Sequence, residues 1–134
     1  GDEMLLAMLD QNLGTVANIR GNLDLALRSY ESSRRRFRTL GKSLYEAHVL
    51  NNVGMVYTDL GHWEDAETAY AAACDACESA DEAGLLRRIE VNQAELWIAR
   101  HEISKAQERC ESLLRDARSE NNSSAPWHGE VYKH

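Results

Sequence analysis

A chain of 134 residues, 43% of them apolar, is long enough for one domain with a continuous core. Its formal net charge of −7 argues against a nucleic-acid partner, because nucleic-acid-binding domains usually carry a basic excess. No apolar run approaches the roughly 18 residues of a membrane span, and the N-terminal Gly1-Asp2-Glu3 lacks the basic start of a secretory signal. Three cysteines do not suggest a disulfide framework. We therefore expect a soluble, cytoplasmic protein with no membrane partner.

The elements predicted along the chain are all helices. The composition is rich in Ala, Leu, Glu and Arg and includes a single proline, Pro126, which favours helix over strand. The sequence pattern places helices at about 4–20, 23–39, 43–60, 63–80, 82–100 and 103–119.

Turn and cap residues mark the ends of these helices. Gly21 and Gly61 stand between paired helices, where a residue that tolerates a positive φ is needed, and His101 is the imperfect third copy. Ser43, followed three residues later by Glu46, predicts a capping box at the start of the third helix. Asp81 is a candidate cap for the fifth helix.

A 40-residue repeat dominates the sequence. Its clearest members are three triplets spaced by 40 residues: Asn12-Leu13-Gly14, Asn52-Val53-Gly54 and Asn92-Gln93-Ala94. The same spacing relates further sets: Gly21, Gly61 and His101; Leu23, Trp63 and Ile103; Ala26, Ala66 and Ala106; Tyr30, Tyr70 and Cys110. A period of this size is typical of stacked supersecondary units.

Glycine recurs inside the predicted helices, where it costs about 1 kcal/mol relative to alanine. Its recurrence therefore needs a local reason, and we expect a neighbouring helix to approach closely at Gly14, Gly54 and Ala94. Small residues face these positions and aromatic residues fill the space between layers: Ala26, Ala66, Ala106, Tyr30, Tyr70, Tyr57 and Trp97.

The middle copy resembles the tetratricopeptide repeat family, whose units are helix–turn–helix pairs. The residues that carry the resemblance are Val53, Gly54, Tyr57, Gly61, Ala66 and Tyr70. The 40-residue unit is similar to a longer variant found in bacterial multidomain regulators and cell-polarity scaffolds. The resemblance implies an all-α fold, a right-handed α-solenoid with repeats at about 4–41, 42–81 and 82–120. In the third copy Gln93 stands where Leu13 and Val53 are apolar, which puts the packing of that copy in question.

The last residues predict the start of a fourth repeat in 121–134. Asn121-Asn122-Ser123-Ser124 is typical of a turn, and Ala125-Pro126 opens another first helix. A stub with Trp127, Val131 and Tyr132 is too short to complete the repeat. We therefore expect 1–134 to be a single domain and a fragment of a larger protein, whose C-terminal end packs on the third repeat or self-associates.

The resemblance implies a concave groove lined by the first helix of each pair. The residues that it places there are Gln11, Asn12, Thr15, His48, Asn51, Asn52, Met55, Arg88, Asn92 and Glu95. Asn12, Asn52 and Asn92 repeat in phase, and an amide can pair with the main chain of an extended peptide. Alternatively, the three amides bond the adjacent helix and tie the repeats together; both interpretations stand.

Some family members grip a C-terminal carboxylate with polar and basic groove residues. Asn52 and Arg88 fit that pattern, whereas Gln11, Thr15 and Asn92 do not. The sequence therefore does not favour a carboxylate clamp.

Other motifs indicate structural roles. Cys74-Asp75-Ala76-Cys77 has metal-like spacing, but no second pair follows, and Cys110 holds a core-type position, so we predict packing residues and no metal. The basic cluster, Arg34-Arg35-Arg36 with Arg38, is either a solvated face near a helix C-terminus or a partner for acidic Glu64, Asp65 and Glu67. No histidine joins a catalytic motif and no phosphate-binding loop is present, which predicts no enzyme activity and no cofactor.

These observations predict a protein–protein interaction module that binds a peptide or helix of a partner in its groove. The alternative is a regulatory, sensory or self-association domain of a larger protein, such as a bacterial transcription regulator.

Overall fold

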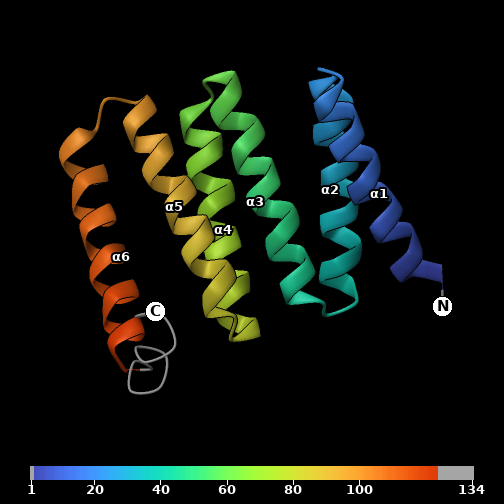
Figure 1. Ribbon diagram of the computed structural model, residues 1–134. Coiled ribbons are helices and arrows are strands. Elements are labelled where there is room, and N and C mark those ends of the chain that lie inside the picture. The colour runs from blue at the N-terminus through green and yellow to red at the C-terminus, as the bar shows by residue number, and fades with distance from the viewer. Residues whose placement is uncertain (1, 124–134) are drawn as a thin grey trace, which may run out of the picture.

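The computed structural model describes residues 2–123, and over these residues the chain forms six α-helices (Figure 1). They are α1 (Asp2–Ile19), α2 (Leu23–Thr39), α3 (Ser43–Leu60), α4 (Trp63–Ala80), α5 (Ala83–Ala99) and α6 (Ile103–Ser123). The all-α prediction and its helix order are confirmed. One boundary is wrong: residues 121–123, predicted as part of a turn, continue α6. The remaining residues of the predicted fourth repeat, Ala125-Pro126, Trp127, Val131 and Tyr132, lie outside the described residues.

The turns within the helix pairs use left-handed backbone at equivalent positions. Gly21, Gly61 and His101 have φ values of 79°, 76° and 63°, so the third copy keeps this conformation without glycine. A left-handed residue also follows α2 and α4, at Gly41 and Asp81. The predicted turn positions are therefore confirmed.

Two predicted caps are wrong for the same reason. Lys42 occupies the N-cap of α3 without a side-chain hydrogen bond, and Ser43 is already helical. Asp81 ends α4 as its left-handed C-cap (φ 54°), and Glu82 precedes α5. In both turns a left-handed residue, Gly41 or Asp81, ends the preceding helix. The residue directly after it, Lys42 or Glu82, is the N-cap of the next helix.

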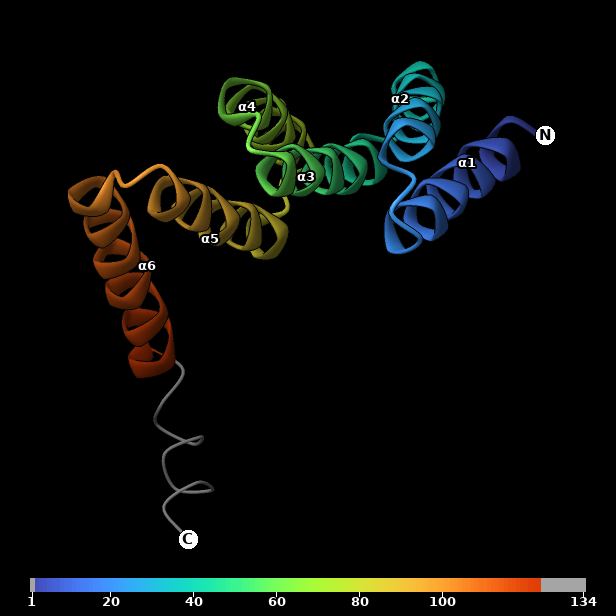
Figure 2. The same cartoon turned by 90° about the horizontal axis from the view of Figure 1, so that it is seen from above.

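The helices pack as antiparallel pairs, and the first helix of each pair joins a continuous row. Figure 2 shows α1, α3 and α5 along one row, with α2 and α4 on one side of it and α6 leaving the end of the row on the opposite side. Each of two core clusters joins a pair to the first helix of the next pair. One contains Tyr30, Phe37, Val49 and Val56, and the other contains Tyr70, Cys77, Leu85, Ile89 and Leu96, with smaller residues in both.

The recurring helical glycines make room for tyrosine rings. A Cβ atom on Gly14 would lie 2.6 Å from Cδ1 of Tyr30, and one on Gly54 would lie 2.4 Å from Cε1 of Tyr70. Both rings are almost completely buried. The predicted close approach is confirmed, but the neighbouring group is the tyrosine ring of the paired helix rather than its alanine.

The third pair is assembled differently. Cys110 replaces the tyrosine and is exposed, so its predicted core position is wrong; among the described residues of α6, only Ala106 is buried. Trp97 of α5 instead lies beneath the cations of α6, with Lys105 Nζ 4.5 Å and Arg109 Cζ 4.7 Å from its ring centroid. Arg109 also donates to Gln93 Oε1 (2.8 Å), which explains the polar residue at that position.

Candidate partner-binding surface

The candidate groove residues lie on the side of the α1, α3 and α5 row that faces away from α2 and α4. Gly14, Gly54 and Ala94 face their paired helices or the core. The three in-phase asparagines lie two residues earlier, about 200° around each helix, and so point to the opposite side. Figure 2 shows that the row curves away from α2 and α4, and we call this side the concave face.

The ten predicted residues differ in accessibility. Exposed residues of the set are Asn12, Thr15, Met55, Arg88 and Glu95. Half-buried residues are Gln11, His48, Asn52 and Asn92, and Asn51 is buried. The concave face therefore offers side chains from all three first helices, but not every predicted residue is available to a partner.

Two of the asparagines bind each other. Asn92 Nδ2 donates to Asn51 Oδ1 at 2.9 Å, across the boundary between α3 and α5. One partner is buried and the other is half-buried. The bond links α3 to α5 and so joins the second and third repeats. Within the described part of the chain, Asn12 and Asn52 make no hydrogen bond through their side chains, so the three members of the asparagine repeat differ in environment.

The charged residues of the concave face influence one another. Burial lowers the pKa of His48, and the positive charge of Arg88 lowers it further, while Glu82 opposes this shift. The imidazole is therefore neutral at pH 7, and Arg88 supplies the positive charge next to it. Arg88 is exposed, whereas Asn92, which stands where a carboxylate clamp would need a second basic residue, is held by Asn51.

Apolar residues that sequence reasoning missed also lie on this face. Met8 shares the repeat position of His48 and Arg88, and Val91 shares that of Gln11 and Asn51. Both are about half exposed, as is the predicted Met55. Their shared repeat phase was the available signal. The concave face thus alternates amide, charged and apolar groups.

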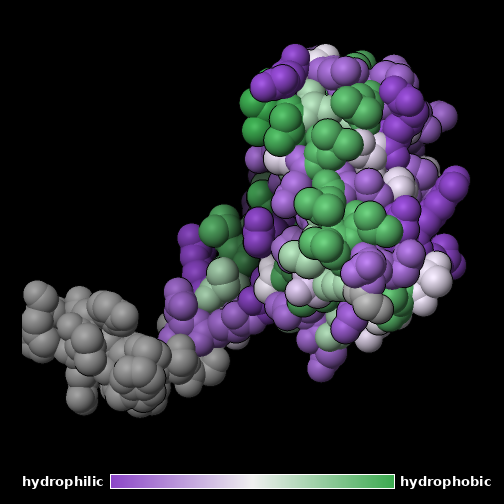
Figure 3. Space-filling view, turned by 90° about the vertical axis from the view of Figure 1, so that its right-hand side faces the viewer, coloured by the Kyte–Doolittle hydropathy of each residue, from purple (hydrophilic) through white to green (hydrophobic). Residues whose placement is uncertain are grey.

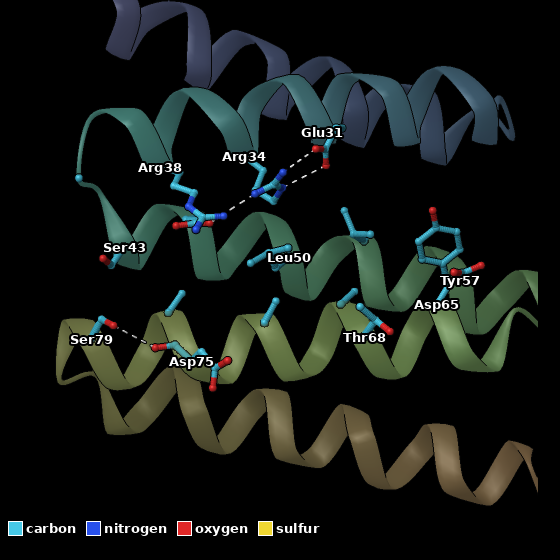
Figure 4. A pocket seen from close by; sticks show the side chains of 16 residues that line it. Glu31, Arg34, Arg38, Ser43, Leu50, Tyr57, Asp65, Thr68, Asp75 and Ser79 are labelled. Carbon is cyan, nitrogen blue, oxygen red and sulfur yellow. Dashed lines mark hydrogen bonds and ion pairs between the residues drawn. The ribbon is translucent and has the colours of Figure 1, made fainter.

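A second depression, which the sequence did not indicate, lies between α2 and α4 (Figure 4). This lateral cleft has a volume of about 670 Å³ and a floor formed by Leu50, Val53 and Tyr57 of α3. Arg34 and Arg38 stand on the α2 wall, whereas small and acidic residues form the α4 wall: Asp65, Thr68, Ala69, Ala72, Asp75, Ala76 and Ser79. The cleft depends on the spacing of two helices that do not follow each other in the chain.

The arginine cluster is largely engaged in ion pairs, but not with the predicted acids. Arg34 binds Glu31 and reaches Glu46 of α3 at 3.7 Å. Arg36 binds Glu3 and Asp10 of α1. The predicted pairing with Glu64, Asp65 and Glu67 is wrong. α2 and α4 run parallel, so the start of α4 lies opposite the start of α2, whereas the arginines lie in the last turns of α2 (Figure 4).

Glu67 pairs with the third repeat instead. Its carboxylate accepts from Trp97 Nε1 at 2.8 Å and lies 3.6 Å from Arg100.

The CxxC pair has the character of packing residues. Burial raises the pKa of the Cys74 thiol to about 11, with a contribution from Glu90, and burial also raises the pKa of Cys77. Both groups are thus protonated at neutral pH, which disfavours metal binding and nucleophilic chemistry. Among residues 2–123, no three His, Cys, Asp or Glu side chains gather where they could hold a metal ion. Every helix in the described range is too short or too polar to cross a membrane.

Comparison with known proteins gives one match. The family model for the tetratricopeptide repeat matches residues 4–79, which is more than half of the chain and includes both of the first two helix pairs. No curated protein and no solved structure matches the chain significantly.

Proposed function

The chain belongs to the tetratricopeptide repeat family, and we propose that its concave face binds a peptide or helix of a partner protein. Members of this family are generally protein–protein interaction modules rather than catalysts. The proposal assigns that general role to a particular surface of this chain and, in line with three free cysteines, to the cytoplasm.

The observation that carries the proposal is a polar surface that the fold does not use. Asn12 and Asn52 point away from their paired helices and make no side-chain hydrogen bond in the described part of the chain. A helix position that served only packing would favour a better helix former than asparagine. Met55 is exposed one helical turn from Asn52, so a ligand there finds both a main-chain hydrogen-bond partner and apolar contact.

Asn51 and Asn92 have a supporting role in this proposal. Their hydrogen bond holds α3 and α5 in register. Asn52 and Met55 of α3 are thereby presented on a fixed surface, which reduces the entropy that binding costs. Asn52 is the residue on which we expect binding to depend most.

A peptide library displayed on phage, selected against the 134-residue chain, supplies the probe. For a selected peptide we expect Asn52→Ala to weaken affinity about tenfold, the effect of losing one or two hydrogen bonds. Thr68→Ala in the lateral cleft is the matched control and should leave affinity unchanged. If replacing Asn12, Asn52 and Asn92 together changes neither affinity nor selectivity, the concave amides do not bind the peptide.

A further inference from the structure

The outer side of α1 carries a continuous apolar stripe. Figure 3 views the molecule from the end where α1 lies and shows hydrophobic residues gathered along that face. The stripe consists of Leu5, Leu6, Leu9, Leu13 and Val16, whose exposed fractions lie between 39% and 55%. We call these five residues the α1 end face. A cluster of this size on one helix is more than the scattered apolar residues of an ordinary surface.

In the other two pairs, the equivalent positions of the 40-residue repeat are buried where one helix pair packs on the preceding one. The counterparts of Leu9 and Val16 are Val49 and Val56 in α3, which are fully buried against the first pair. In α5 they are Ile89 and Leu96, which are fully buried against the second pair. The α1 end face therefore has the pattern of a surface on which a preceding second helix docks.

The internal junctions show which residues meet across such an interface. At the first junction the ring of Phe37 stacks on Tyr45 with centroids 5.1 Å apart, and Arg34 lies 3.7 Å from Glu46. At the second junction the counterparts are apolar. Cys77 and Leu85 share one core cluster, and Cys74 and Leu86 pack against it.

The first and last described helices, α1 and α6, continue this correspondence. The counterparts of Arg34 and Glu46 are Leu114 on α6 and Leu6 on α1; those of Phe37 and Tyr45 are Ala117 and Leu5. The two positions that form the Arg34–Glu46 ion pair at the first junction are therefore apolar on both α6 and α1, as they are at the second junction. Leu114 is half exposed, and Cys110 and Ala117 beside it are exposed. We call Cys110, Leu114 and Ala117 the α6 end face.

From this correspondence we propose that the α1 end face of one copy docks on the α6 end face of a second copy. Figure 1 shows α1 and α6 at opposite ends of the array, so the two faces of one copy do not meet. The contact brings together the repeat positions that meet at the internal junctions. It is a heterologous, head-to-tail contact, which permits growth beyond a dimer as concentration rises.

Sedimentation velocity over a concentration series of the 134-residue chain tests this contact. We expect the average mass of the parent to rise with concentration. Leu9→Glu and Leu114→Glu each place a charge in the contact and should weaken association by at least about 30-fold. Because both side chains are about half exposed, the variants should keep the parent circular-dichroism spectrum. Leu60→Glu, an exposed apolar residue at the end of α3 in the middle pair, is the matched control and should associate like the parent.

An equimolar mixture of the two variants identifies the pairing. Each variant retains one intact end face, so the mixture should form one-to-one dimers that do not grow further. A parent that stays monomeric at all concentrations overturns the proposal and leaves the α1 end face to a different occupant. A Leu114→Glu variant that still dimerises, or a mixture that remains monomeric, overturns the pairing of α1 with α6.

Discussion

The first two helix pairs and the third share a 40-residue spacing but hold their second helices by different contacts. In α2 and α4 a buried tyrosine ring lies directly on a glycine of the paired helix. In the third pair Ala94 and Cys110 occupy these positions, and Lys105 and Arg109 of α6 lie over the ring of Trp97. The glycine and the tyrosine are therefore one paired feature, and where one is replaced the other is replaced as well.

The largest expected effect comes from filling the space beneath a tyrosine ring. Gly54→Leu places a side chain where even a Cβ atom would lie 2.4 Å from the buried ring of Tyr70. We expect this change to lower the free energy of unfolding by about 3 kcal/mol or more. Thermal and urea unfolding followed by circular dichroism measure it.

Gly84 provides the matched control. It is an exposed helical glycine whose added Cβ would meet only the flexible carboxylate of Glu82, at 3.3 Å. Gly84→Ala should therefore stabilise the protein by about 0.5–1 kcal/mol, through helix propensity alone. A Gly54→Leu variant that melts within a degree of the parent would contradict the close packing of the tyrosine ring.

A smaller effect is expected when the alanine and cysteine of the third pair replace Gly54 and Tyr70 of the second pair. Tyr70→Cys alone should cost about 3 kcal/mol, because it removes a buried ring. In that background Gly54→Ala no longer meets the ring, and we expect it to stabilise by about 0.5–1 kcal/mol. In the parent the same Gly54→Ala change should destabilise by about 1–2 kcal/mol. A double-mutant cycle in urea, under reducing conditions, measures this change of sign; additive effects would show that the two residues are independent.

The arrangement of helices was predictable because it depends on local and periodic signals. Gly14 and Gly54 are costly inside helices, so their recurrence indicated close contact before the contacting group was known. The caps at Ser43 and Asp81 were mispredicted because side-chain capping preferences are weak beside a left-handed residue that already ends the preceding helix. The exposure of Cys110 depends on what packs around α6, which the repeat phase alone does not specify.

The candidate surface was only partly predictable. Repeat phase indicated the direction of Asn12 and Asn52, because the side of a helix on which a residue lies is a property of that helix alone. It did not reveal that Asn51 is buried against α5, because this depends on the distance between two first helices. The lateral cleft has the same origin: its small residues Ala69 and Ala72 lie opposite α2 only in the folded array.

Loss of the cation contacts of Trp97 should loosen the third pair selectively. Arg109→Met keeps the aliphatic stem but removes the charge above the ring and the bond to Gln93. We expect a loss of about 1 kcal/mol. Hydrogen exchange should show faster exchange in α6 and little change in α2 and α4. The exposed Arg115 is the matched control, and Arg115→Met should leave exchange unaltered; equal acceleration in all helices after Arg109→Met would argue against a local role.

The smallest expected effect concerns the far end of the third pair, where Arg87 of α5 binds Glu120 of α6. The hydrogen bond from Arg87 lowers the pKa of Glu120 in the folded protein, so the carboxylate binds a proton less readily there than in the unfolded chain. A group of this kind contributes stability above its unfolded pKa of about 4.5, and the contribution is lost as pH falls through the lower folded value. The pair is exposed, so solvent and salt screen it strongly. We therefore expect Glu120→Gln to melt slightly below the parent at pH 7 and at the same temperature as the parent once the pH is below the folded pKa of Glu120, where both side chains are neutral. Glu108→Gln, an exposed α6 change outside this ion pair, should show no such convergence. If the difference between parent and Glu120→Gln persists unchanged at low pH, the contribution of Glu120 is not electrostatic.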